Sequence, residues 1–154
     1  MAGTRPRGPL ASSEVVRRRF AGQGRRDTRP ELRLRRELHR RGLRYRVDRA
    51  VPGLARVRPD LLFPGARLVV FVDGCFWHAC DEHAHLPESN TAWWLAKLEA
   101  NVLRDRRADA RLIALGWEVL RVWEHEDPAE AADRVEGLVR SRTAQARTSS
   151  SAIS

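Results

Sequence analysis

The chain has 154 residues and a formal net charge of +9. This length suits one compact domain with a hydrophobic core, and the basicity favours a polyanionic partner such as nucleic acid. No apolar run approaches the roughly 20 residues that span a bilayer, and the arginine-containing N-terminus lacks an apolar h-region. We therefore expect neither a membrane span nor a signal peptide.

The positive charge is concentrated in residues 1–46, which hold 15 arginines against four acidic residues, a surplus of 11. Arginine binds phosphate through paired hydrogen bonds, so we expect salt-dependent attachment to nucleic acid. A solvated basic tail is the alternative for part of this charge. We expect disordered tails at residues 1–12 and 143–154, and one domain at residues 13–142 with a basic N-terminal arm at residues 13–27.

The first predicted helix begins near Thr28. Thr28 is a favourable N-cap residue, Pro30 suits the first turn, and Glu31 stands three residues after Thr28 as in a capping box. Gly42 is expected to end this helix. The helix is arginine-rich and amphipathic, with its apolar positions at Leu32, Leu34 and Leu38.

Three strands are expected next. Residues 43–47 alternate between apolar and polar types and predict a strand. Residues 59–63 and 68–72, joined by a Pro64-Gly65 turn, predict a β-hairpin. The second hairpin strand is apolar throughout, which is typical of a central strand covered on both faces.

The rest of the chain predicts helix, strand and helix. The helix at residues 91–115 is ended by Gly116, a strand follows at residues 118–123, and a last helix runs from Asp127-Pro128 through Val139. No internal repeat is evident. The order αβββαβα predicts an α/β fold in which a small mixed central sheet is flanked by helices.

The segment at residues 73–83, DGCFWHACDEH, holds both cysteines, two of the five histidines and an adjacent aromatic pair. Two cysteines this close could form a small disulfide, but metal binding is favoured in a chain without an expected export signal. Because metal-ligand chemistry and base-stacking surface share one loop, we expect the functional site here.

Asp60 lies at the start of the first hairpin strand, across from Val72-Asp73 at the end of the second. An aspartate before an apolar strand can be a turn or cap residue. This one also has backbone carbonyls beside it, a setting that supplies hard oxygen ligands for Mg²⁺. The Pro59-Asp60 layout resembles the PD-(D/E)xK nuclease superfamily, although Phe71-Val72-Asp73 stands where Glu-x-Lys or a variant is expected.

Residues 15–128 closely resemble the very short patch repair (Vsr) endonucleases. The resemblance is carried by the motif VFVDGCFWH at residues 70–78, by Trp93-Trp94, by residues 101–107 and by residues 122–124. It implies a divergent PD-(D/E)xK, restriction-endonuclease-like fold with a structural zinc site. It further implies an enzyme that nicks DNA on the 5′ side of the thymine in a T:G mismatch, the lesion left when 5-methylcytosine deaminates.

The same resemblance implies a catalytic Mg²⁺ site. Asp60 would bind the catalytic Mg²⁺, and Val72 would contribute its backbone carbonyl. His78 would position or deprotonate the attacking water, a role that suits a side chain with an ordinary pKa near 6.5. Glu31 would support the metal–water network.

Several of these residues have alternative roles. His78 could instead be a third ligand beside Cys75 and Cys80, and Glu31 could serve only in helix capping. Asp73 stands where some relatives carry His or Asn, and it could add a metal ligand or have no role.

The resemblance also implies zinc. Cys75, Cys80 and His83 give the spacing C-x4-C-x2-H, and His125 completes a Cys₂His₂ set that suffices for a closed tetrahedral site. His85 is the alternative to His83. A reduced cysteine pair with surface histidines is the alternative to zinc.

Aromatic residues are expected to enter DNA as a wedge. Phe76 and Trp77 are adjacent and cannot easily face one core, and related enzymes insert such aromatics beside the mismatch. Trp94 joins this wedge by its position, and Phe20 matches a position that inserts from the other groove. The remaining tryptophans are predicted to be structural: Trp93, Trp117 and Trp123.

The expected partner is double-stranded DNA with a T:G mismatch, and the family implies a companion DNA cytosine methyltransferase and a bacterial, cytoplasmic, nucleoid-associated setting. Mismatch-repair proteins are candidate partners that no residue identifies, and we expect a monomer. A zinc-stabilised DNA-binding protein without catalysis and a same-fold nuclease without mismatch specificity are the alternatives. A binding module would need neither Asp60 nor His78 at the hairpin end.

Overall fold

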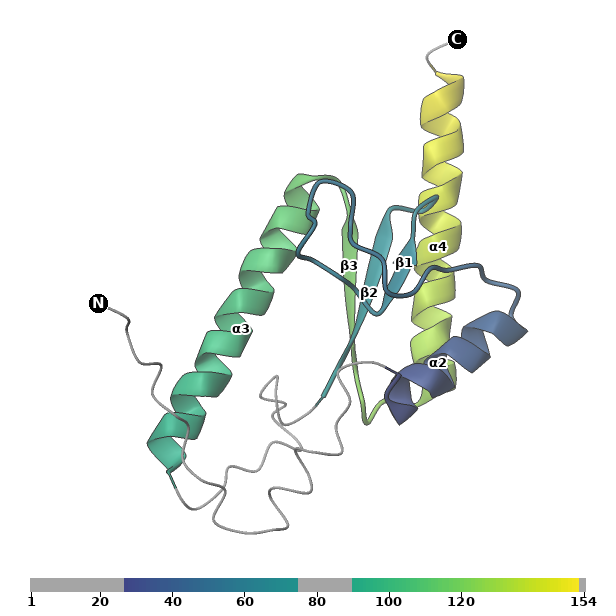
Figure 1. Cartoon of the computed structure of the whole chain (residues 1–154). Helices are drawn as coiled ribbons and strands as arrows, with labels where there is room; N and C mark the ends of the chain where they lie inside the picture. Colours follow the sequence, from purple (N-terminus) through teal and green to yellow (C-terminus); the bar gives the residue numbers. More distant parts are fainter. Residues whose placement is uncertain (1–26, 75–89, 153–154) are drawn as a thin grey trace.

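The computed structural model describes residues 27–74 and 90–152. Three strands form one sheet in the order β1-β2-β3, with β1 antiparallel and β3 parallel to β2. The expected small mixed sheet with flanking helices is confirmed (Figure 1). The described elements are α2 (Arg29–Arg40), β1 (Leu61–Phe63), β2 (Leu68–Asp73), α3 (Thr91–Ala114), β3 (Glu118–Trp123) and α4 (Pro128–Ser151).

Strand β2 lies in the middle of the sheet, as its apolar sequence predicted, and separates two hydrophobic clusters. Alternate side chains of a strand point to opposite faces, so Leu68 and Val70 pack with α2 and α4. Val69 lies on the other face and packs with Leu112 of α3 and with Trp117. The burial of Trp117 at 7% exposure confirms its structural role.

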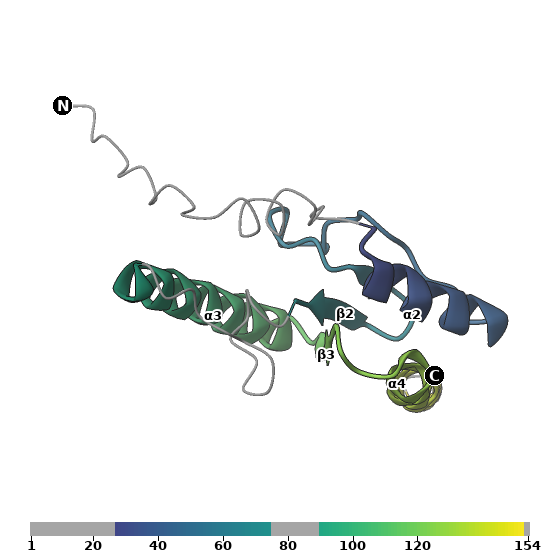
Figure 2. The ribbon, with the colours of Figure 1, turned by 90° about the horizontal axis from the view of Figure 1, so that it is seen from below.

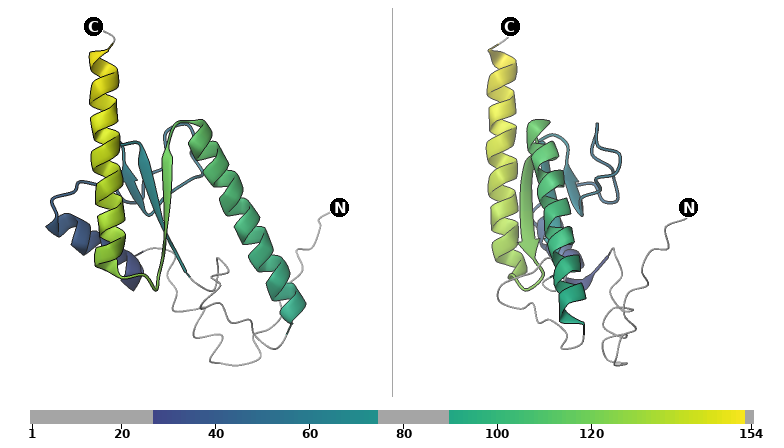
Figure 3. Two further views of the ribbon diagram at one scale, coloured as in Figure 1. Left: turned by 180° about the vertical axis from the view of Figure 1, so that it is seen from behind. Right: turned by 90° about the vertical axis from the view of Figure 1, so that its left-hand side faces the viewer.

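Helices α2 and α4 lie side by side, as seen from below in Figure 2 and from behind in Figure 3. Leu34 and Leu38 of α2 and Val135 of α4 contribute to the same cluster. Arg41, at the end of α2, also bonds Asp133 at 2.5 Å and Glu136 at 3.0 Å. Within the described ranges, no helix is long and apolar enough to cross a membrane.

The start of α2 differs from the expected capping box. Thr28 occupies the N-cap position and Pro30 the first turn, and Gly42 with φ +77° ends the helix, as predicted. However, the Thr28 side chain makes no capping hydrogen bond. Glu31 is instead buried at 2% exposure and accepts a hydrogen bond from Arg35. The capping-box prediction is therefore wrong, and Glu31 is held inside the protein.

The predicted strand at residues 43–47 is reduced to one β-bridge between Arg46 and Leu62. The alternation in the sequence arises because Leu43 and Tyr45 pack against the core from one side. Pairing stops there because Asp48 adopts φ +54° and turns the chain.

Helix α4 is longer than expected. It ends at Ser151 instead of Val139, so residues 143–151, predicted to be a disordered tail, are helical. Good helix formers such as Ala and Gln continue past Gly137. Arg142 also anchors the helix, because it donates to the carbonyl of Ala66 at 2.7 Å and to that of Gly116 at 2.9 Å.

Candidate active site

Asp60 lies just before β1 and reaches across to β2. Its Oδ2 accepts a hydrogen bond from the backbone N–H of Val72 at 2.6 Å. The paired register of the hairpin ends one residue earlier, at Leu61 opposite Val70, so the Asp60 side chain continues the ladder beyond the last strand pair. The predicted proximity of Asp60 and Val72 is confirmed.

The carbonyl of Val72 points to the same edge as its N–H. The backbone N–H and C=O of Leu62 both pair with Arg46 and so point away from β2. The backbone groups of its neighbours Leu61 and Phe63 therefore point toward β2, and those of Val70, opposite Leu61, point toward β1. Because the direction of the backbone groups alternates along a strand, the N–H and C=O of Val72 point to the same edge as those of Val70. The Asp73 carbonyl faces the other way, where it accepts from the N–H of Glu124 at 3.0 Å. One carboxylate and one carbonyl therefore meet beside β1.

Burial raises the pKa of Asp60 from its ordinary 3.8 to about 6. The hydrogen bond from Val72 opposes this shift, whereas the negative charges of Glu31 and Asp73 raise the pKa further. The positive charge of Arg35 lowers it. Glu31 and Asp73, from separate parts of the chain, thus both act on Asp60, and a cation beside Asp60 would offset their charge.

Glu31 is brought to this cluster by α2. Its partner Arg35 also donates to Asp27 at 2.7 Å, and the hydroxyl of Tyr45 donates to the carbonyl of Arg35 at 3.0 Å. These contacts fix the arginine that holds Glu31. Glu31 therefore lies close enough for its charge to act on Asp60, and its role in the metal–water network stays a prediction.

Asp73 is bound by Arg121, a residue that the sequence analysis did not predict to belong to the site. Arg121 of β3 donates from Nη1 to both oxygens of Asp73, at 3.1 and 3.0 Å. The same guanidinium donates to Asp109 of α3 at 2.9 and 2.6 Å. A lone arginine within the apolar strand VLRVW is the signal that could have revealed this contact, because a cation in a sheet requires an anionic partner.

These donors suit Mg²⁺. Among the described residues, Asp60 is the one acid of the three that forms no ion pair, and the Val72 carbonyl lies at the same edge. Mg²⁺ is commonly held by one or two carboxylates, with water and substrate phosphate completing its shell. The described residues accordingly contain no group of three or more His, Cys, Asp or Glu side chains able to hold a metal ion by themselves.

Most of the predicted loop residues lie outside the described residues, so their placement stays a prediction: His78, the zinc ligands Cys75, Cys80 and His83 with the alternative His85, and the wedge residues Phe76, Trp77 and Phe20. His125 is described. It is exposed and stacks on Trp123, with ring centroids 6.4 Å apart and planes at 12°.

The tryptophan pair at the start of α3 is placed differently from the expectation. Trp94, predicted to enter DNA, is buried at 8% exposure, whereas Trp93 is half-buried. The two rings meet edge to face with centroids 4.7 Å apart, and the Lys97 ammonium lies 5.4 Å from the Trp93 ring centroid. Of the two, Trp93 is the more accessible.

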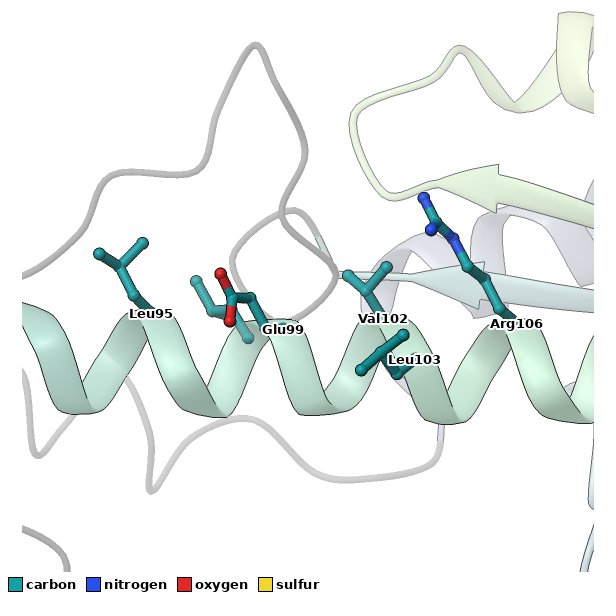
Figure 4. Close-up of a pocket in the computed structure, with 6 residues that line it drawn as sticks. Leu95, Glu99, Val102, Leu103 and Arg106 are labelled. Carbon is teal, nitrogen blue, oxygen red and sulfur yellow. The ribbon is translucent and has the colours of Figure 1, made fainter.

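An open apolar groove also runs along α3 (Figure 4). Its polar lining consists of Glu99 and Arg106, which do not form an acid cluster like that around Asp60. We therefore assign it no catalytic role. The groove is lined by Leu95, Leu98, Glu99, Val102, Leu103 and Arg106.

The chain is similar to known DNA endonucleases. Residues 14–84 match the family model of the DNA mismatch endonuclease Vsr. The chain is 45% identical over 111 residues to the type II nicking enzyme V.NaeI of Lentzea aerocolonigenes, a match that covers 70% of this chain and 66% of the relative.

Two further relatives are each 47% identical over 103 residues. For the type II nicking enzyme V.XorIIP of Xanthomonas oryzae the match covers 65% of this chain and 72% of the relative. For the DNA mismatch endonuclease Vsr of Escherichia coli it covers 64% and 62%. The chain thus spans about two thirds of the length of these relatives, and it belongs to the Vsr family.

Proposed function

We propose that this protein is a Mg²⁺-dependent endonuclease that nicks one DNA strand on the 5′ side of the thymine in T:G mismatches. The observation that carries the proposal is Asp60, a half-buried carboxylate that meets the Val72 edge of β2 in a member of the Vsr family. A half-buried acid with a raised pKa and no ion pair to another described residue is typical of functional sites.

The chain's own residues divide the chemistry. Asp60 and the Val72 carbonyl would hold the metal, whose charge stabilises the phosphodiester transition state when it is bound. Glu31, fixed by Arg35, would orient the water network beside them. His78 would take the proton of the attacking water. The fold that supports this arrangement would be a divergent PD-(D/E)xK nuclease fold.

DNA as the substrate is supported by exposed charge around α2 and the loop before β1. Several arginines there form no ion pair with another described residue, which leaves their guanidinium groups available for phosphate. Affinity should therefore fall steeply with salt concentration. These exposed residues are Arg29, Arg33, Arg36, Arg44, Arg46, Arg49 and Arg56.

The loop between β2 and α3 would supply mismatch selectivity. Cys75, Cys80, His83 and His125 would hold zinc and brace the loop, while the aromatic pair that follows Cys75 enters the DNA. Unstacking costs least at a mispaired step, so such a wedge favours mismatches.

The cellular setting belongs to the same proposal. We expect a monomer in the bacterial cytoplasm, associated with the nucleoid. It would act with a DNA cytosine methyltransferase and with mismatch-repair proteins.

A nicking assay tests the proposal. Labelled duplexes with one T:G pair in varied flanking sequences are incubated with Mg²⁺ and compared with fully paired duplexes. Asp60→Asn is expected to lower the nicking rate about 10³-fold or more, as removal of a principal catalytic group does. Asp48→Asn is the matched control, since Asp48 is exposed and its φ of +54° is well tolerated by asparagine.

Two outcomes would favour the alternatives. If wild-type protein binds these duplexes but never nicks them, it is a DNA-binding protein without catalysis. If it nicks paired and mismatched duplexes at equal rates, it is a nuclease of this fold without mismatch specificity.

A further inference from the structure

Arg121 is the cation that joins three acids on the α3 side of the sheet. It lies opposite Phe71 in the parallel ladder, and its guanidinium carbon sits 4.4 Å from the centroid of that ring. Beyond the hydrogen bonds to Asp73 and Asp109, it approaches Asp105 of α3 to 4.0 Å. The stacking and the paired hydrogen bonds restrict the guanidinium to one orientation.

Asp73 follows Val72 directly at the end of β2, so its carboxylate is the acid nearest in sequence to the Val72 edge. Its charge already acts on Asp60. Alternation along β2 places its side chain with Val69 and Phe71, on the face toward α3, where Arg121 holds both oxygens.

Glu31, the other acid near Asp60, is held in the same way by Arg35. Each flanking acid therefore has its own arginine, and Asp60 has none among the described residues. Of these three carboxylates, only that of Asp60 is therefore without an arginine partner among the described residues.

We propose that Arg121 is a positioning residue of the metal site: it holds the Asp73 carboxylate on the α3 side of β2 and leaves Asp60 alone at the Val72 edge. This inference rests on the proposed function. It also assigns Asp73 a role, as an acid kept away from the metal and used to tie β2 to β3 and α3.

The hold of Arg121 on the Asp73 carboxylate, the Arg121 clamp, is tested by three variants: Arg121→Met, Asp73→Asn and the double variant. Mn²⁺ binding to the free protein is followed by electron paramagnetic resonance, and nicking of the T:G duplex is measured in parallel. Arg121→Met is expected to bind Mn²⁺ at least about 5-fold more tightly, because an Asp73 carboxylate released from Arg121 adds a ligand. Its kcat should fall by roughly 10- to 100-fold because the metal is misplaced, with little change in KM.

Asp73→Asn and the double variant should return both readouts to within about threefold of wild type, since neither carries a carboxylate at residue 73. Arg67→Met is the matched control. Arg67 also stacks on an aromatic ring of this sheet face, 5.5 Å from the centroid of Trp117, at the other end of the strands.

The outcomes separate the clamp from the proposed function. If Asp73→Asn abolishes Mn²⁺ binding or nicking, Asp73 is itself a ligand and the clamp is wrong. The clamp is also wrong if Arg121→Met lowers nicking only in step with a lower melting temperature, and if adding Asp73→Asn to it does not restore nicking. If wild type neither nicks nor binds Mn²⁺ in a way that Asp60→Asn removes, the proposed function fails first, and the clamp fails with it.

Discussion

The two ends of α2 use the same chemistry in opposite settings. At the C-terminal end, Glu37 pairs with Arg40 at 2.7 Å and with Arg41 at 3.1 Å, and Arg41 continues to two acids of α4. At the N-terminal end, Glu31 pairs with Arg35, but the carboxylate is buried and acts on Asp60.

The difference concerns what each acid does to its neighbours. Hydrogen bonds from Arg40 and Arg41 lower the pKa of Glu37, so its ionised form is favoured where water is near. Glu31 instead adds negative charge near Asp60, whose pKa is already raised by its partial burial. At the C-terminal end the acid is stabilised by its arginines, whereas at the N-terminal end the acid raises the pKa of its neighbour Asp60. Such unfavourable placement marks a functional site more clearly than the number of ion pairs does.

Substitution of the two glutamates should give the largest contrast. Glu31→Gln is expected to reduce nicking by roughly 10- to 100-fold, as loss of a residue that supports a metal site does. Glu37→Gln, two turns further along the same helix, should leave nicking unchanged. Single-turnover nicking at saturating Mg²⁺ measures both, and equal rates for the two variants would remove Glu31 from the site.

Asp60→Asn should stabilise the protein at neutral pH even though it stops nicking. The pKa of Asp60 is raised from 3.8 to about 6, so the folded state binds this proton more tightly than the unfolded state. Stability is therefore lost as pH rises between about 4 and 6, and the loss persists above that range. A pKa raised from 3.8 to about 6 corresponds to at most about 3 kcal/mol of stability.

Urea denaturation at pH 4 and pH 7.5 checks this prediction. The gain of the variant over wild type should appear at pH 7.5 and vanish near pH 4. A variant that is less stable than wild type at pH 7.5 would show that the Val72 hydrogen bond outweighs the burial of charge.

The smallest effect is expected at the other end of α2. Arg41→Gln removes the ion pairs to α4 and should lower the melting temperature slightly, with no change in nicking. Because these pairs are near water, the difference from wild type should shrink in 1 M salt, where the screening length is only about 3 Å. Thermal melts at low and high salt measure it, and a nicking defect would mean that the α2–α4 contact also shapes the acid cluster.

Local patterns predicted the part of the site that lies within one hairpin. Asp60 and Val72 are twelve residues apart in a hairpin whose register follows from its turn, so their contact could be foreseen. Glu31 could be placed only by family resemblance, because no local rule brings a helix to a hairpin thirty residues away. Arg121 was missed because its partners lie on β2 and α3, and such contacts depend on strand order.

The errors in the predicted secondary structure have related causes. The alternation at residues 43–47 was real, but one face of a segment can pack on a core without a neighbouring strand to pair with, and Asp48 turns the chain away. The length of α4 depended on Arg142 reaching two turns of the sheet, a tertiary contact that composition does not reveal.

The contacts that anchor α4 and the acid cluster lie at opposite ends of β2. Arg142 binds carbonyls at Ala66 and Gly116, just before β2 and β3 begin, whereas the acid cluster lies where β2 ends. The six-residue strand β2 spans about 17 Å between these points. The exposed end of α4 near Ser151 is thus a site where a fluorophore or surface tether can be attached without touching the acidic edge, so that single molecules can be watched as they search DNA.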